Sequence, residues 1–272
     1  MMPISSDSEL LSSLRDAVRY LEGRTNEFAE LRRLLFSSTW PEATPAFAIC
    51  KTETDKLDRA AAVLDDMNVN LTGKRFLDFG CGEGHAVVVA AERGAAATGY
   101  DPEKVSDNSL VTSDWDAVKL HGPYEVVLIC DVLDHCDDPV AALKMVREVI
   151  SPDSVVYCRC HPWTSPHGGH HYHTVNKAYA HLVFSENEQA ELGMEPPPTG
   201  VRTMFPHVDN EAWFTSAGFH VVWHEQVGVE VDRFFKTNPI LSRRLSRPEY
   251  KGKFPDKQLS QEFNNYVIAP NA

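Results

Sequence analysis

The sequence of 272 residues has no long hydrophobic run. Its longest apolar stretches, such as 86–91 and 126–130, are far shorter than the roughly 20 residues that a membrane-spanning helix needs. The first residues contain neither the basic segment nor the apolar segment of a secretory signal. We therefore expect a soluble, cytoplasmic protein that has no membrane partner.

An excess of basic residues is also missing. Lys and Arg number 26 against 39 Asp and Glu, so the formal net charge is −13. Proteins dedicated to DNA or RNA normally carry a basic surface, so the composition argues against nucleic acid as a partner. Apolar residues at 43% and charged residues at 24% are typical of a folded globular domain.

The six cysteines, at 50, 81, 130, 136, 158 and 160, contain no C-x-x-C pair. Because most of them lie in or beside apolar runs, we expect reduced thiols rather than disulfides. Cys158, Cys160 and His161 resemble a metal cluster in spacing. Alternate residues of a strand share one face, however, so a buried strand explains the two cysteines better than a zinc site.

Hydrophobic periodicity changes in character at about residue 74. Before it, the spacing of leucines predicts two helices within 7–37 and a third over about 54–67. After it, the pattern alternates between strands, at 75–79, 97–100, 110–112, 124–130, 154–160, 219–225 and 263–268, and helices, at 85–93, 138–150 and 209–217. This alternation predicts a parallel sheet covered by helices on both faces.

The domain organisation follows from the same pattern. We expect one α/β domain over residues 69–272, preceded by a helical appendage or lid at 1–68. Two insertions, at about 161–208 and 228–261, interrupt the domain. The first follows the fifth strand and is the more lid-like, and we expect it to close over the cleft together with the N-terminal helices.

The most informative segment is a glycine-rich loop between a predicted strand and a predicted helix. Gly80, Gly82 and Gly84 form a G-x-G-x-G pattern after Asp78. Closely spaced glycines at the start of a helix let a ligand approach backbone N–H groups. A dinucleotide-binding loop would need its third glycine where His85 stands, and no Walker A loop is present.

Three further segments follow this loop in order. Asp101-Pro102 ends the second strand, Ser113-Asp114-Trp115 follows the third, and the fourth ends in the run Cys130-Asp131-Val-Leu-Asp-His135 before an Asp-Pro turn. Together the four motifs resemble the class I S-adenosylmethionine (SAM)-dependent methyltransferase superfamily. The resemblance covers roughly residues 74–160 and the last strands.

This resemblance implies a doubly wound, seven-stranded sheet whose last strand is antiparallel. It also implies that SAM is bound, and S-adenosylhomocysteine released, by Asp78, Gly80, Cys81, Gly82, Gly84, Asp101, Pro102, Asp114, Trp115 and Asp131. In that family the glycine loop wraps the carboxypropyl and ribose parts of SAM. A carboxylate such as Asp101 accepts both ribose hydroxyls, and the segment around Asp114 holds the adenine.

A histidine-rich stretch begins where the fifth strand ends, with imidazoles at His161, His167, His170, His171 and His173. Ligands of open α/β sheets bind beyond the carboxyl ends of the strands. The histidines could supply a general base, ligands for a divalent metal, or only a solvated lid. We expect no resident metal, and we predict catalytic roles for His161, His167 and His170, with His135 as a further candidate.

The sequence therefore predicts transfer of a methyl group from SAM to an oxygen or nitrogen of a small molecule. An acidic surface and two lid-like insertions favour an enclosed pocket. The second insertion carries a basic run that is either a solvated face or a site for an anionic acceptor, consisting of Arg233, Lys236, Arg243, Arg244, Arg247, Lys251, Lys253 and Lys257. Two alternatives remain: methylation of a protein or nucleic acid, and a non-catalytic module that binds SAM. The sequence does not indicate the oligomeric state.

Overall fold

A seven-stranded sheet forms the centre of the structure, a computed structural model that describes residues 7–43, 50–103, 107–194, 210–245 and 259–271. The strands are β1 (Arg75–Phe79), β2 (Ala96–Tyr100), β3 (Val111–Thr112), β4 (Tyr124–Cys130), β5 (Ile150–Cys160), β6 (Phe219–Gly228) and β7 (Gln261–Pro270). Their order is β3-β2-β1-β4-β5-β7-β6, with β1 to β5 parallel and β7 antiparallel to both of its neighbours. The predicted fold class is confirmed.

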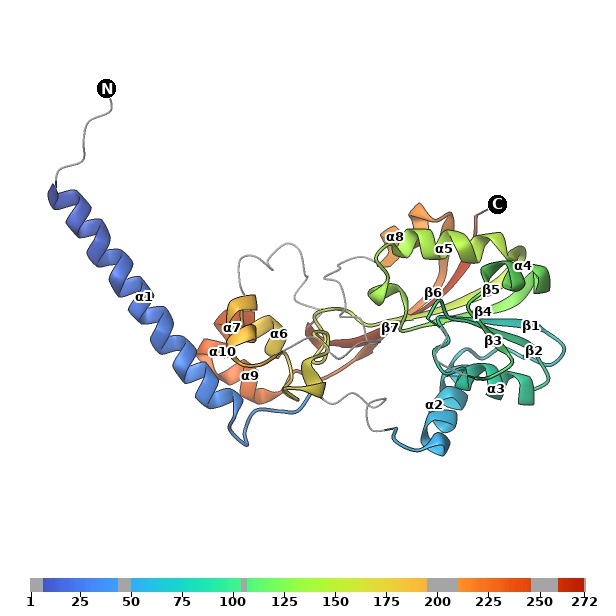
Figure 1. Ribbon diagram of the computed structural model, residues 1–272, viewed down its shortest axis with the longest axis horizontal. Coiled ribbons are helices and arrows are strands. Elements are labelled where there is room, and N and C mark those ends of the chain that lie inside the picture. Colours follow the sequence, from blue (N-terminus) through green and yellow to red (C-terminus); the bar gives the residue numbers. More distant parts are fainter. Residues whose placement is uncertain (1–6, 44–49, 104–106, 195–209, 246–258, 272) are drawn as a thin grey trace, which may run out of the picture.

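Helices cover both faces of this sheet (Figure 1). One face is covered by α2 (Glu53–Asp66) and α3 (His85–Glu92), and the other by α4 (Trp115–His121), α5 (Pro139–Glu148) and α8 (Asn210–Ser216). Neighbouring residues of a strand point to opposite faces, so Phe76 packs in the core under α2 and α3, whereas Leu77 packs in the core under α5 and α8. Both faces of β1 are therefore buried, as its continuous apolar run predicts.

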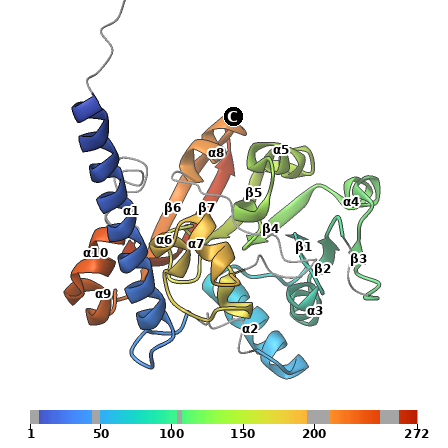
Figure 2. The same cartoon turned by 60° about the vertical axis from the view of Figure 1, so that its left-hand side comes forward.

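A second group of helices has a hydrophobic core of its own, and we call it the helical module. It consists of α1 (Asp7–Leu35), residues 36–43, α6 (Ala180–Val183), α7 (Glu186–Glu191), α9 (Arg233–Thr237) and α10 (Pro239–Leu245). Trp40 lies at its centre, where the indole N–H donates to the Ala178 carbonyl oxygen at 2.9 Å. Figures 1 and 2 show the module to one side of the sheet, with α1 extending away from it. Three segments far apart in the sequence thus form one packed unit.

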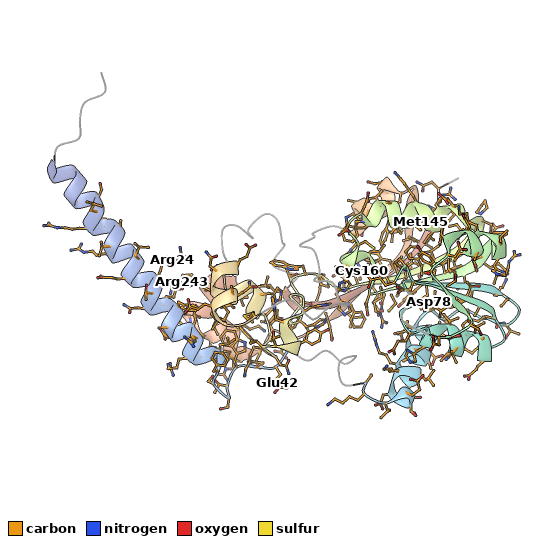
Figure 3. The ribbon with its side chains drawn as sticks, viewed as in Figure 1. Arg24, Glu42, Asp78, Met145, Cys160 and Arg243 are labelled. Atoms are coloured by element: carbon orange, nitrogen blue, oxygen red, sulfur yellow. The ribbon has the colours of Figure 1, made fainter. Side chains whose placement is uncertain are left out.

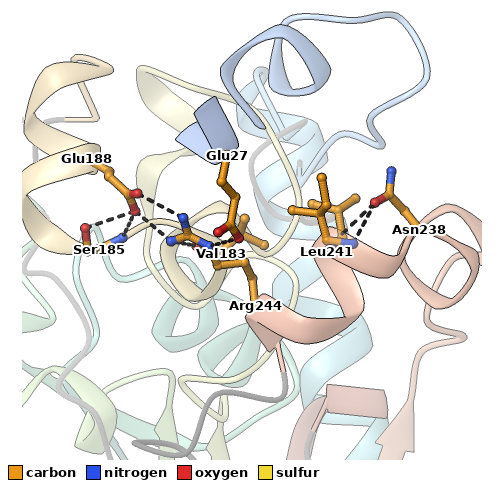
Figure 4. A network of polar contacts seen from close by, with 8 residues as sticks. Glu27, Val183, Ser185, Glu188, Asn238, Leu241 and Arg244 are labelled. Atoms are coloured by element: carbon orange, nitrogen blue, oxygen red, sulfur yellow. Dashed lines mark hydrogen bonds and ion pairs between the residues drawn. The ribbon is translucent and has the colours of Figure 1, made fainter. Parts of the chain in front are cut away.

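One arginine of the second insertion ties the helical module together. Arg244 is buried, and its guanidinium lies 3.0 Å from a carboxylate oxygen of Glu27 in α1 and 3.0 Å from one of Glu188 in α7 (Figure 4). Arg244 is therefore neither part of a solvated face nor available to an anionic acceptor, because its guanidinium pairs with two carboxylates of the protein. The run's residues at 247, 251, 253 and 257 lie outside the described residues.

The prediction of two helices within 7–37 is wrong, because α1 is one helix of 29 residues. The segment contains no proline, and Gly23 costs an exposed helix position only about 1 kcal/mol relative to alanine. Leu21 and Phe28 are seven residues apart, so the two apolar stripes continue on one helix face. The third predicted helix is found as α2. Within the described residues, no helix is both long and apolar enough to cross a membrane.

Candidate active site

A cavity of about 730 Å³ lies at the carboxyl ends of β1, β4 and β5. The strand order reverses between β1 and β4, which is where open α/β sheets bind their ligands. The cavity brings together eight of the predicted site residues, Asp78, Gly80, Cys81, Gly82, Asp131, His135, His161 and His170. Figure 3 marks Asp78 near the end of β1 and Cys160 at the end of β5, which lie toward the same carboxyl-terminal edge of the parallel strands.

The glycines of the loop have positive φ angles, which residues with side chains rarely adopt. Gly80 has a φ of +80°, and a Cβ atom there would come within 2.4 Å of the Val132 side chain. Gly82 has a φ of +52°, and a Cβ atom there would meet nothing within 4 Å. The cavity therefore reaches the main chain at Gly82, where a ligand can approach the backbone closely.

Asp101 holds the glycine loop to the end of β2. Its Oδ2 accepts the Gly82 N–H at 2.9 Å, and its Oδ1 accepts the Glu103 N–H at 3.0 Å. Burial, with a smaller contribution from the charge of Asp101, raises the pKa of the neighbouring Asp78 to about 7. Asp78, which lines the cavity, and Asp101, which lies outside the cavity lining, are therefore two neighbouring carboxyl groups that disfavour simultaneous ionisation.

The other predicted cofactor residues lie outside the cavity lining. Asp114 is the N-cap of α4, and its Oδ1 accepts the Asp116 N–H at 2.9 Å. The Trp115 ring packs edge-on against Tyr100, with ring centres 4.9 Å apart. Pro102 is exposed after β2, and Gly84 is the N-cap of α3. Their contacts with a cofactor stay predictions.

Three elements meet at Asp131, immediately after β4. Its Oδ1 lies 2.9 Å from His161 Nδ1 at the end of β5, and its Oδ2 lies 3.0 Å from Arg59 Nη2 on α2. The residue has a φ of +58°, in the left-handed region that non-glycine residues rarely adopt. Such strained positions are found at functional sites when the surrounding contacts hold them.

The contact between Asp131 and His161 changes both protonation equilibria. Burial raises the pKa of Asp131, but the charge and hydrogen bond of His161, followed by the charges of Arg59 and Arg159, lower it well below its usual range. Burial lowers the pKa of His161, but the charge and hydrogen bond of Asp131 outweigh this and raise it above its ordinary value. The cavity wall therefore holds an ionised carboxylate next to a basic imidazole.

The histidine-rich stretch is packed rather than solvated. His167 and His170 are buried, and burial lowers the pKa of His170 to about 3, with a further contribution from His135. The rings of His135 and His170 lie 4.7 Å apart, and both line the cavity. His167 lies behind them, with its ring centre 4.9 Å from that of His161, and it does not line the cavity. His171 is half-buried, and the His173 side chain lies outside the described part of the structure.

Sequence reasoning missed Arg59, Arg159 and Tyr172. Arg59 and Tyr172 line the cavity, whereas Arg159 holds β5 in place: its Nη2 lies 2.7 Å from Asp66 and its Nε donates to Asn265 Oδ1 at 2.9 Å. Tyr172 and Arg159 lie inside segments that the sequence analysis singled out, but only folding shows that they and Arg59 are neighbours of the cavity residues. Within the described ranges, no three His, Cys, Asp or Glu side chains are arranged to hold a metal.

An open α/β sheet with a glycine loop and a cavity at its switch point defines a class of small-molecule-binding domains. Comparison with known families narrows this class. Residues 49–224 match a family described as a methyltransferase domain. The chain belongs to this family, and the class I SAM-dependent methyltransferase superfamily predicted from the motifs is confirmed.

Curated relatives match parts of the chain. The ubiquinone biosynthesis O-methyltransferase of Pseudomonas aeruginosa strain LESB58 is 29% identical over 107 residues, which are 34% of this chain and 46% of that protein. The protein of the same description from Stutzerimonas stutzeri strain A1501 is 25% identical over 177 residues, 57% of this chain and 68% of that protein. The chain thus spans about half the length of the first of these relatives.

Solved structures of similar fold include a SAM-dependent methyltransferase from Archaeoglobus fulgidus. It has a TM-score of 0.48 and 16% identity, over 79% of this chain and 94% of that one. The magnesium protoporphyrin IX methyltransferase from Synechocystis PCC 6803 with bound S-adenosylhomocysteine has a TM-score of 0.43 and 16% identity, over 95% of this chain and all of the other.

Proposed function

We propose that this protein transfers the methyl group of SAM to a hydroxyl oxygen of a small aromatic molecule, with His161 as the general base. The observation that carries the proposal is the contact of 2.9 Å between His161 Nδ1 and Asp131 Oδ1 on the wall of the cavity. A carboxylate that holds one ring nitrogen fixes the tautomer and leaves Nε2 to accept a proton.

The cavity carries groups that suit the ribose and the amino-acid part of SAM. The exposed backbone at Gly82 and the carboxylates of Asp78 and Asp101 surround the expected position of the ribose and the amino-acid part. Arg59 lies across the cavity on α2, where its guanidinium suits the carboxylate of the bound amino-acid part. When bound, SAM supplies an electrophilic methyl group attached to a positively charged sulfur.

The chain's own residues then remove a proton and align the acceptor. As the hydroxyl oxygen bonds to the methyl carbon, its proton moves to His161 Nε2, and the electron pair of the breaking bond stays on sulfur. Asp131 stabilises the imidazolium that results. Four histidines line the cavity, and His161 has the shortest contact with a carboxylate: 2.9 Å to Asp131, against 3.2 Å between His85 and the exposed Glu53. Its raised pKa also makes it a better base near neutrality than His170.

The shape and chemistry of the cavity support a small aromatic acceptor. Its volume of about 730 Å³ is within the usual range for small-molecule sites. The rings of Tyr172, His135 and His170 line it and suit a flat, hydroxylated ring. The relatives described as ubiquinone biosynthesis O-methyltransferases are consistent with oxygen as the methylated atom.

The experiment compares His161→Ala and Asp131→Asn with the native protein and with His121→Ala, an exposed histidine at the end of α4. Release of S-adenosylhomocysteine is measured with a panel of hydroxylated aromatic acceptors, and SAM affinity is measured by calorimetry. We expect His161→Ala to lower kcat by about 100-fold or more. SAM affinity should change little in that variant, and His121→Ala should behave as the native protein.

The pH dependence gives a second readout. Neutral His161 is the active form, so the rate should fall as pH drops through a pKa above about 6.5. Asp131→Asn removes the charge that raises this pKa, so the acid limb should move to lower pH while kcat decreases. Near-native turnover in His161→Ala would contradict the assignment of the base. Absence of SAM binding by the folded native protein would contradict the proposal as a whole.

A further inference from the structure

The N-terminal half of α1 presents an apolar stripe to solvent. Leu14, Val18 and Leu21 are 54%, 52% and 59% exposed, whereas Leu31 and Leu35 further along the helix are buried in the helical module. Figures 1 and 2 show this half of the helix extending away from the rest of the molecule. A lone helix of this kind is only marginally stable in water, and its apolar face gains stability from a partner.

The stripe has the spacing of a coiled coil. Leu14, Val18, Leu21 and Thr25 follow each other at intervals of four, three and four residues, which are the d and a positions of a heptad. The helix surface is hollowed along this line, in a shallow groove lined by Val18, Leu21, Glu22, Thr25 and Asn26. Knobs from a second helix need holes of this sort.

We propose that this face binds the same face of a second copy of the chain, as an antiparallel two-helix coiled coil. The charges beside the stripe are self-complementary. With Val18 at an a position and Leu21 at a d position, Arg15 and Glu22 both occupy e positions. When Val18 lies opposite Leu21 of the second copy, Arg15 therefore faces Glu22 of the second copy. Two-fold symmetry repeats the contact, so the dimer contains two such ion pairs.

A parallel pairing lacks this match, because Glu22 at e would face Ala17 at g. A lipid surface is also a poorer partner. Between residues 12 and 26 the helix has three arginines against one Asp and one Glu, and no run of basic residues of the kind that attracts anionic lipids. The alternation of sign along one edge instead favours an oppositely running copy of the same helix.

Charge exchange on the full chain tests the orientation. Sedimentation over a range of concentrations should show a monomer–dimer equilibrium for the native protein. Arg15→Glu and Glu22→Arg should each weaken the dimer by about tenfold, because each creates two like-charge contacts. The double variant R15E/E22R should recover the native affinity, and an equimolar mixture of the two single variants should form heterodimers in preference to either homodimer.

A second set of variants tests the surface itself. Val18→Asp should abolish dimerisation, whereas Leu120→Asp, at a leucine of α4 that is 84% exposed, should leave it unchanged. Circular dichroism checks that every variant stays folded. A native protein that is monomeric at all concentrations, or a dimer that survives Val18→Asp, would overturn the proposal. So would a double variant no better than the single ones, or binding of the monomer to phosphatidylcholine–phosphatidylserine vesicles through this face.

Discussion

Two carboxyl groups at neighbouring strand ends, the buried Asp78 and the half-buried Asp131, have opposite electrostatic surroundings. Asp131 lies within 3.0 Å of both Arg59 and His161, so its negative charge is compensated. Asp78 is buried beside Asp101, and within the described residues it has no ion pair. The first is therefore held ionised, whereas the second is near its midpoint of titration at neutral pH.

We expect Asp78→Asn to stabilise the ligand-free protein at high pH. A pKa raised from 3.8 to about 7 means that ionised Asp78 lowers the free energy of unfolding above pH 7, by up to about 4 kcal/mol. At a pH below its pKa in the unfolded chain, a carboxyl group is protonated in both states and does not lower the free energy of unfolding. The gain from the substitution should therefore shrink as pH falls from 7 to about 4.

Urea unfolding at pH 8, 6 and 4 measures this effect. Asp153→Asn, at an exposed position, is the matched control and should change the free energy of unfolding by less than about 0.5 kcal/mol at each pH. An Asp78→Asn protein no more stable than the native one at pH 8 would show that Asp78 is already compensated. The same variant should bind SAM more weakly if Asp78 contacts the cofactor.

Among the elements, α1, α7 and α10 depend on one shared ionic contact. Arg244 on α10 lies between Glu27 of α1 and Glu188 of α7, and its side chain is only 8% exposed. Glu188 also accepts the Ser185 N–H that begins α7. The three helices come from different parts of the chain, so this contact fixes their relative positions.

Arg244→Met should therefore lower the free energy of unfolding by about 3 kcal/mol, the low end for a buried ion pair, because the half-buried carboxylates of Glu27 and Glu188 lose their partner but keep some contact with water. The neighbouring Arg243→Met is the matched control, since Arg243 is exposed on the same helix (Figure 3). Thermal and urea unfolding of the full chain make the comparison. Equal stability of the two variants would mean that hydrophobic contacts alone hold the module together.

The whole molecule contains hydrophobic cores on the two faces of the sheet and a separate core in the helical module. Trp40 stacks on Phe184, with ring centres 6.1 Å apart, and also contacts Phe234 and Phe235. These contacts join the N-terminal segment to both insertions. The candidate active-site cavity lies beside the sheet cores and not within the core of the helical module.

Because the cores are separate, we expect Trp40→Ala to destabilise the helical module selectively. Loss of a buried tryptophan costs about 3–5 kcal/mol. Hydrogen exchange of the amides in α6 and α10 should become faster, while exchange in β1 and β4 should change little. Equally faster exchange throughout would instead show that the module and the sheet unfold as one unit.

Local sequence patterns were sufficient for most of the sheet. Strand β4 was predicted with its observed bounds, and the positions of the glycine loop and Asp101 followed from spacing along the chain. Short elements were missed: α4, α6, α7, α9 and α10 have four to seven residues each, too few for a clear helical period. The parts of the candidate site on the glycine loop and just after β4 and β5 could be predicted because they belong to contiguous motifs.

The family, the strands of the sheet and the candidate cofactor residues could be predicted because each has a local signature, either the hydrophobic pattern of one strand or a motif of contiguous residues. Two contacts become visible only in the folded chain: the one between His161 and Asp131, and the one by which Arg59 of α2 reaches the same carboxylate. These residues, at 59, 131 and 161, are separated by long stretches of chain. Their proximity, like the burial of Arg244, results from how helices pack on a sheet, which no local pattern encodes.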